Sequence, residues 1–202
     1  MLIKHQEKLP KIHRSAYVAP GAIVCGDVTV GEGARILHGA VVIDEGGKVS
    51  IGRYCIVMHN AVIRSTARHS AGMGEHCLIG PTAHLAGCTL EESVFVATGA
   101  AVFHGARMGA RSEVRVNGVV HVKSHLMPDA TVPIGWVAVG SPAEILPPGD
   151  HEEIWAIQQT LDFPQVVYGV ERPAPGHTNM PEITRRLSRT YGAHYDDEVV
   201  SC

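Results

Sequence analysis

The sequence predicts an all-β solenoid in which short strands coil into stacked triangular turns, followed by a helical extension. Three observations predict this fold class. Aliphatic residues recur with a period of six, 22 of the 202 residues are glycine, and aromatic residues make up only 5% of the chain. A core with few aromatic rings must be filled by Val, Ile, Leu and Ala, which favours a thin and regular core.

The six-residue period is the main evidence for the solenoid. Four residues after most of its aliphatic positions comes a small residue or Val. A period of about 3.6 or simple alternation does not explain this spacing. A short strand followed by a corner does, because the aliphatic side chain fills the interior and the small residue lets the backbone turn. With two breaks and one slip of a residue, the aliphatic positions are Val18, Val24, Val30, Ile36, Val42, Ile51, Val57, Ile63, Ile79, Leu85, Leu90, Val96, Val102, Met108, Val114, Val120, Leu126 and Val132.

Three such units close one coil of 18 residues, and the strands of successive coils pair in parallel. Residues at the same point of successive coils then stack about 4.8 Å apart. Beside the face that runs from Val18 to Val132, this stacking places His38 and His59 on adjacent rungs. Beside the next face, it aligns one column of residues, namely Cys25, Ile43, Arg64, Ala86, Phe103 and His121.

The repeat ends at residues 140–143, and two domains are expected: a β-helix over 10–146 and a helical extension over 150–195. The first helix of the extension is predicted over 150–162. Asp150 can cap it, and the apolar residues that share one of its faces are Ile154, Ile157 and Leu161.

The rest of the extension is expected to be irregular over 163–179 and helical again over 181–193. The second helix has Ile183, Leu187 and Tyr191 at four-residue spacing. Residues 196–202 are expected to fray. A helix packed along a β-helix would cover an exposed strand edge.

Composition excludes several classes of protein. A formal net charge of −3 is too balanced for a dedicated nucleic-acid binder. The longest apolar runs are far shorter than the roughly 20 residues that a membrane span needs, and no signal peptide is visible. We therefore expect a cytoplasmic protein with reduced cysteines. Without a CxxC pair, we interpret most of these as packing residues; they are Cys25, Cys55, Cys77, Cys88 and Cys202.

Several segments resemble the γ-class carbonic anhydrases, a family of hexapeptide-repeat proteins. The resemblance covers roughly residues 10–146, and the long tail is similar to the phenylacetate-degradation thioesterase branch. It implies a left-handed parallel β-helix that forms a homotrimer with its sites between subunits. The segments that carry the resemblance are Gly39-Ala40-Val41-Val42, Val49-Ser50-Ile51-Gly52, Asn60-Ala61-Val62-Ile63, Ile79-Gly80, Leu85-Ala86-Gly87-Cys88-Thr89-Leu90 and Val139-Gly140-Ser141-Pro142-Ala143.

The resemblance also implies three zinc-binding histidines, and this chain has other residues at those places. Arg64, Pro81 and Ala86 stand where the family has its ligands. None of them can supply the imidazole that a catalytic zinc requires. We therefore expect no zinc at this position, no other cofactor, and no CO2 hydration of the family type.

The resemblance implies that one subunit's His38 and His59 face Glu45 and Arg64 of its neighbour. We interpret His59, His38 and Glu45 as candidate catalytic residues, and Arg64 and His84 as candidate substrate-binding residues. An acid–base pair beside an anion-binding Arg suits a carboxylate or thioester substrate. The alternative is a site that has lost its function, whose polar residues pair across the subunit interface.

A shifted metal site is a weaker alternative. His59, His69, His76 and His84 lie around an inserted loop at 64–78, but they lack the His-x-His or His-x3-His spacing of metal ligands. Two further histidines, His104 and His121, are expected to be ordinary residues of the outer face.

Three functions stay open from the sequence. The leading one is a hydrolase or lyase that acts on a small acyl, thioester or carboxylate compound. The others are a non-enzymatic binding or assembly subunit and a CoA-dependent acyltransferase.

Overall fold

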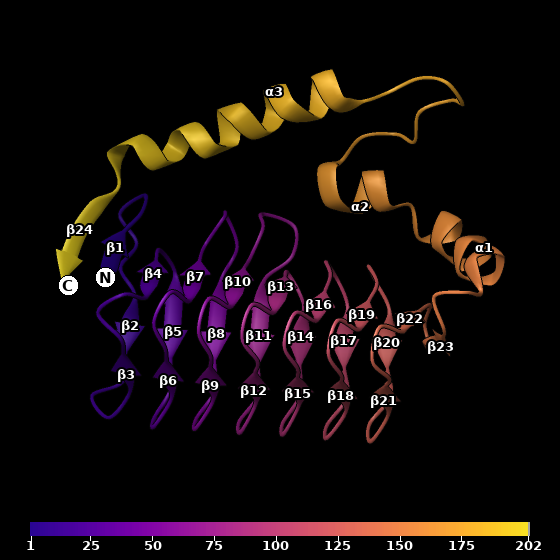
Figure 1. Cartoon of the computed structure of the whole chain (residues 1–202). Helices are drawn as coiled ribbons and strands as arrows, with labels where there is room; N and C mark the ends of the chain where they lie inside the picture. The colour runs from indigo at the N-terminus through magenta and orange to yellow at the C-terminus, as the bar shows by residue number, and fades with distance from the viewer. Residues whose placement is uncertain (202) are drawn as a thin grey trace.

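The structure, a computed structural model that describes residues 1–201, is the parallel β-helix with C-terminal helices that the sequence predicts (Figure 1). Sheet A has ten strands, and sheets B and C have seven each. Sheet A contains β1 (Leu2–Lys4), β4 (Ile23–Cys25), β7 (Val41–Ile43), β10 (Val62–Arg64), β13 (His84–Ala86), β16 (Ala101–Val102), β19 (Val119–Val120), β22 (Val137–Val139), β23 (Glu144–Leu146) and β24 (Glu198–Ser201). Sheet B contains β2 (Lys11–Ile12), β5 (Val28–Val30), β8 (Val49–Ile51), β11 (Ala71–Met73), β14 (Thr89–Leu90), β17 (Arg107–Met108) and β20 (His125–Leu126). Sheet C contains β3 (Tyr17–Val18), β6 (Arg35–Ile36), β9 (Ile56–Val57), β12 (Leu78–Ile79), β15 (Phe95–Val96), β18 (Glu113–Val114) and β21 (Thr131–Val132).

The interior of the solenoid is the aliphatic core that the six-residue period predicts. On sheet A, the column through Val24, Val42, Ile63 and Leu85 is in parallel register, and each of these side chains is at most 1% exposed. The column from Val18 to Val132 forms sheet C in the same way. The stacking of both faces is therefore confirmed.

Three of the cysteines pack in this core, as expected. Cys55, Cys77 and Cys88 are buried among the aliphatic residues. Cys25 is also buried but stands outside that core, because it follows the inward-facing Val24 on β4 and strand side chains alternate. Cys202 lies outside the described residues.

The inserted loop expected at 64–78 is shorter than predicted. β11 lies within it and pairs in parallel with β8 and β14, and Met73 fills an interior position at 6% exposure. The sequence hides this strand because Ala71 and Gly72 have little strand propensity, and Met73 stands where the repeat elsewhere has Val, Ile or Leu. Only a short excursion remains, closed by a bridge between Thr66 and His69.

Two of the helices match their predicted ranges. Helix α1 (His151–Leu161) begins after Asp150, although that side chain makes no capping hydrogen bond, and helix α3 (Met180–Tyr191) corresponds to the second predicted helix. Helix α2 (Phe163–Tyr168) lies in the segment expected to be irregular. Pro164 does not interrupt it, because this residue sits in the first turn, where proline favours a helix.

Residues 196–201 are ordered rather than frayed, which corrects this part of the prediction for residues 196–202, while Cys202 lies outside the described residues. A 3-10 helix, η1 (Gly192–Asp196), follows α3 and leads into β24. β24 pairs antiparallel with β1, with Lys4 opposite Glu198. An unpaired edge strand leaves backbone N–H and C=O groups without hydrogen-bond partners. β24 supplies these partners at the edge that β1 would otherwise expose.

Helix α3 returns along the solenoid toward its first coil (Figure 1). Its residues line a common cavity with residues of β10 and β13, so it lies over the outer face of sheet A. None of the helices within residues 1–201 has the length and apolar character that crossing a membrane requires.

The first break in the repeat holds a fully buried carboxylate, that of Asp44. Its Oδ2 accepts hydrogen bonds from Lys8 Nζ and from the Asp27 amide, both at 3.1 Å, and its Oδ1 accepts one from the Gly46 amide at 2.6 Å. Asp44 therefore joins three segments of the first coils.

We predict that Asp44→Ala lowers the free energy of unfolding by about 1–3 kcal/mol, because three donors lose a buried acceptor. Urea denaturation of the purified protein measures this change. Glu92→Ala, which removes an exposed carboxylate, serves as the control and should stay within about 0.5 kcal/mol of the wild type. Equal stability of the two variants would show that the contacts of Asp44 with the three segments do not stabilise the protein.

Candidate functional site

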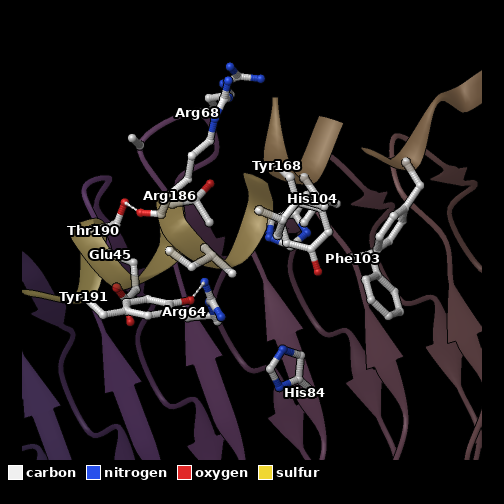
Figure 2. Close-up of a pocket in the computed structure, with 16 residues that line it drawn as sticks. Glu45, Arg64, Arg68, His84, Phe103, His104, Tyr168, Arg186, Thr190 and Tyr191 are labelled. Atoms are coloured by element: carbon white, nitrogen blue, oxygen red, sulfur yellow. Dashed lines mark hydrogen bonds between the residues drawn. The ribbon is translucent and has the colours of Figure 1, made fainter. Parts of the chain in front are cut away.

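A cavity of about 410 Å³ lies between sheet A and helices α2 and α3 (Figure 2). Its floor contains Arg64 from β10 and His84 from β13, and Glu45 enters from the loop after β7. Helix α3 contributes Leu187 and Tyr191 to the roof. The solenoid alone would leave this floor open to solvent, so the cavity exists because the tail folds back over it.

The structure brings together three of the five site residues that the sequence predicts. Glu45, Arg64 and His84 line the cavity. His38 and His59 are exposed at the turns between sheets C and A, on adjacent rungs as expected, since the Asn60 amide donates to the His38 carbonyl at 3.2 Å. Neither lines the cavity of its own chain.

Arg64 is the central cation of the cavity floor. It pairs in register with Ile43 on one side and with Ala86 on the other, as the predicted column requires. Its Nη2 donates to the Tyr191 hydroxyl at 3.3 Å, while its buried Nε has no hydrogen-bond partner among the described residues. A guanidinium with a buried, unused N–H is suited to holding an anion.

Two imidazoles stand near this guanidinium. Burial lowers the pKa of His84, and the charge of Arg64 lowers it further. Burial likewise lowers the pKa of His104 to about 4, with smaller contributions from Arg64, His69 and His84. Both rings are therefore neutral at pH 7 and can accept a proton.

His104 and His121 are not the ordinary outer-face residues that the sequence predicts. They are only 6% and 9% exposed, and the Nδ1 atom of each has no hydrogen-bond partner among the described residues. The His121 ring lies 6.0 Å from that of Phe163 on α2. The repeat predicts that both side chains point outward, but it carries no signal for the helices that then cover them.

The other side of the cavity is apolar. Phe103 and Phe163 meet edge to face with their centroids 6.1 Å apart, and Ile183 and Leu187 of α3 lie above the floor. In Figure 2, Glu45 and Arg64 lie to the left of His104, and Phe103 lies to its right. The cavity can therefore hold a small molecule with an anionic group and an apolar or acyl part.

Two further arginines stand at the rim and are tied to α2. Arg68 donates to the Gln165 carbonyl at 3.0 Å, and Arg186 donates to the Gly169 carbonyl at 3.1 Å. Arg186 is also paired with Glu182 at 2.6 Å, so the positive charge that favours the approach of an anion comes mainly from Arg68.

The four histidines of the alternative metal site are not brought together. His76 stacks on Tyr54 at 5.4 Å, His69 lies 6.1 Å from His104, and His59 is exposed on another turn. In residues 1–201, the group of three or more potential metal ligands lies elsewhere and contains His5, Cys25, His194 and Asp197.

The residues that the sequence resemblance aligns with the family's zinc ligands do not suit a zinc ion. Arg64 and Ala86 are direct neighbours on β10 and β13. A guanidinium repels a dication, and a methyl group has no ligand atom, so these positions cannot bind zinc in the family manner.

We predict that the stability of the protein falls as the pH falls from 7 to 4, partly because of His104. Its folded-state pKa lies below its unfolded value, so its stabilisation is complete above about pH 6.5 and is lost as the pH falls toward 4. His104 accounts for about 3 kcal/mol of this loss in the free energy of unfolding. Urea denaturation at pH 7, 5.5 and 4.5 should give a smaller pH dependence for His104→Gln. His13→Gln, at an exposed site, should keep the wild-type dependence, and identical slopes for all three proteins would contradict the prediction.

No protein-family model matches the sequence. Mitochondrial γ carbonic anhydrase 1 of Arabidopsis thaliana is 31% identical over 160 residues, which cover 76% of this chain and 56% of that protein. The carnitine operon protein CaiE of Salmonella agona is 29% identical over 164 residues, covering 77% of this chain and 76% of that one. The chain spans about half the length of the two Arabidopsis carbonic anhydrases that it matches over 160 residues.

Solved structures share the fold. A candidate acetyltransferase of Bacillus cereus superposes with a TM-score of 0.54 at 22% identity, covering 78% of this chain and 90% of that one. A UDP-N-acetylglucosamine acyltransferase of Bacteroides fragilis gives 0.51 at 14% identity, covering 90% and 89%. The chain is thus similar in sequence to the γ carbonic anhydrases and to related proteins built from the same repeat.

Proposed function

We propose that the cavity under α3 binds a small acyl, thioester or carboxylate compound and acts on it as a hydrolase or lyase without using a zinc ion at the family position. The observation that carries this proposal is the combination of two imidazoles that burial keeps neutral and a guanidinium whose buried Nε–H has no partner among residues 1–201. Phenylacetate-type thioesters stay one substrate class within this proposal.

Arg64 would hold the negative charge of the substrate. A carboxylate, or the carbonyl oxygen of an acyl group on which charge develops, would accept a hydrogen bond from the Arg64 Nε–H, which no residue within 1–201 uses. Hydrogen bonds from a guanidinium to an oxyanion are roughly twice as strong as neutral ones.

His84 is the better general base of the two cavity imidazoles. His104, with a pKa near 4, binds a proton too weakly to abstract one efficiently. In hydrolysis, neutral His84 would take a proton from the attacking water as the new C–O bond forms. It would return that proton to the thiolate or alkoxide that leaves, so the ring ends the cycle unchanged.

Three predicted site residues remain: Glu45, which lines the cavity, and His38 and His59, which lie outside it. Glu45 Oε2 lies 3.4 Å from His194 Nε2, at the side of the cavity nearest the first coil. His38 and His59 would join the site only from a neighbouring subunit, which connects their proposed catalytic role to the proposed homotrimer.

An apolar groove supports the homotrimer. It occupies about 440 Å³ on the outer face of sheet C and is lined by Met58 next to His59. Leu78, Val116 and Ile134 are 37%, 40% and 67% exposed in it. Burying this groove against a second copy would remove apolar surface from water and bring the turns at His38 and His59 to the neighbour.

We predict that Arg64→Ala and His84→Gln each reduce kcat/KM on the compound that a screen of acyl-CoA thioesters, aryl esters and carboxylates identifies. Losing the base His84 should lower kcat/KM about 10²–10⁴-fold. Losing Arg64 should lower kcat/KM because the acyl oxygen of the bound substrate loses its hydrogen-bond donor. His76→Gln removes an exposed ring outside the cavity and should keep full activity.

The same screen separates the other two functions. Acetyl transfer from acetyl-CoA to an amine or alcohol, with no hydrolysis, would favour the acyltransferase. Inertness of the folded protein on every substrate would favour a binding subunit. If both cavity variants fold and keep full activity, the cavity is not the reaction site.

We predict a mass of about 65 kDa in light scattering at micromolar concentration, three times the 21.6 kDa of the chain. Ile134→Asp, which puts a charge in the groove on sheet C, should shift the mass toward the monomer while circular dichroism stays unchanged. Lys123→Asp, at an exposed residue outside the groove, is the control. A wild-type monomer would contradict the trimer and exclude His38 and His59 from the site.

A further inference from the structure

The chain end meets the first coils in a cluster of four side chains of the kinds that bind metals. These are His5 from the turn after β1, Cys25 at the end of β4, His194 in η1, and Asp197 just before β24. We propose that this cluster is a binding site for a thiophilic transition-metal dication, with Zn²⁺ as the best fit, and that the ion fastens the tail to the solenoid.

The four ligand atoms are already close to one another. All lie within 4.8 Å, with His5 Nδ1 at 2.6 Å from Asp197 Oδ1 and His194 Nδ1 at 2.8 Å from Asp197 Oδ2. Cys25 Sγ is 3.7 Å from the same Oδ2. Zinc bonds of about 2.0–2.3 Å place the ligands of a tetrahedron about 3.3–3.8 Å apart, so small side-chain movements would close this group on an ion.

The donor set selects the class of metal. Two imidazoles, one thiolate and one carboxylate suit zinc and its neighbours, whereas Mg²⁺ and Ca²⁺ prefer oxygen ligands. Four protein ligands fill all positions of a tetrahedral ion and leave none for water, which is typical of a structural site. None of the three positions aligned with the family's zinc ligands takes part in this cluster.

The surroundings support the site further. His5 and Cys25 are only 3% and 1% exposed. If His194 binds the metal through Nδ1, its Nε2 faces Glu45 Oε2 at 3.4 Å, which is the carboxylate–histidine–metal arrangement that orients a ligand ring. The rings of His5 and His194 are stacked with centroids 4.2 Å apart, so both are held in place without an ion.

The placement of the ligands gives the ion a structural role. Two ligands come from the first coils and two from the last residues of the chain, with α3 directly before His194. A metal would therefore cross-link segments far apart in sequence and hold α3 over the cavity. Cross-links that close long loops remove the most freedom from the unfolded chain.

The test begins with the full-length protein stripped of metal by a chelator. Co²⁺ is added as a spectroscopic probe, and then Zn²⁺ is added as its competitor. We expect one Co²⁺ per chain, with the intense visible absorption of a tetrahedral ion and a thiolate-to-cobalt charge-transfer band that Zn²⁺ abolishes. Zinc should also raise the Tm of the stripped protein.

Matched variants assign the ligands. Cys25→Ser should abolish the thiolate band, and His194→Ala should abolish stoichiometric binding. Glu45→Gln should weaken the affinity by about 10–100-fold, as removal of an outer hydrogen-bond partner does. His13→Ala, an exposed histidine that pairs with Ser15, should bind like the wild type.

Three results would overturn the site: no stoichiometric cobalt or zinc in the wild type, weak binding without a thiolate band, or unchanged binding in both Cys25→Ser and His194→Ala. If Cys25→Ser fails to fold, the wild-type cobalt spectrum and His194→Ala still decide. Because the readouts are metal content, spectra and Tm, this inference can fail while the proposed catalysis holds, and the reverse.

Discussion

The pairing of β24 with β1 is the contact on which the rest of the site depends. It fixes the end of the tail to the first coil, while the beginning of the tail is fixed to the last coil through β23 on β22. Helix α3 is held between these two points and lies over sheet A (Figure 1). Without this return, the column that contains Arg64 would be a solvated outer face, and its charges would be screened by water.

Covering sheet A changes the chemistry of the residues below it. Burial keeps His84 and His104 neutral, and it leaves Arg64 with a donor that no described residue uses. A position that the sequence resemblance aligns with a zinc ligand of the family, that of Arg64, thus carries a fixed positive charge. An anion-binding site with neutral bases follows from the same fold, with no change in the path of the solenoid.

The sequence could predict the solenoid because its signal is local and repeated. Every coil needs the same interior side chain, so the register that places Arg64 beside Ala86 follows from counting residues. β11 is not evident from the sequence because Met73 replaces an aliphatic residue, and α2 is not evident because Pro164 is typical of a break although it lies in the first turn of a helix.

The cavity could be predicted only in part, because the docking of the tail is a long-range contact. No periodicity reveals that β24 pairs with β1, and the burial of His104 depends on that docking.

Hydrogen–deuterium exchange on the full-length protein shows whether the tail is held over sheet A, since it reports how firmly each backbone segment is held. We predict that the amides of residues 198–201, α3 and β1 exchange slowly, and that they become fast together in a Glu198→Pro variant while the other coils stay protected. Fast exchange across α3 and β24 in the wild type, with a protected solenoid, would contradict it, because the tail would then not form the roof of the site.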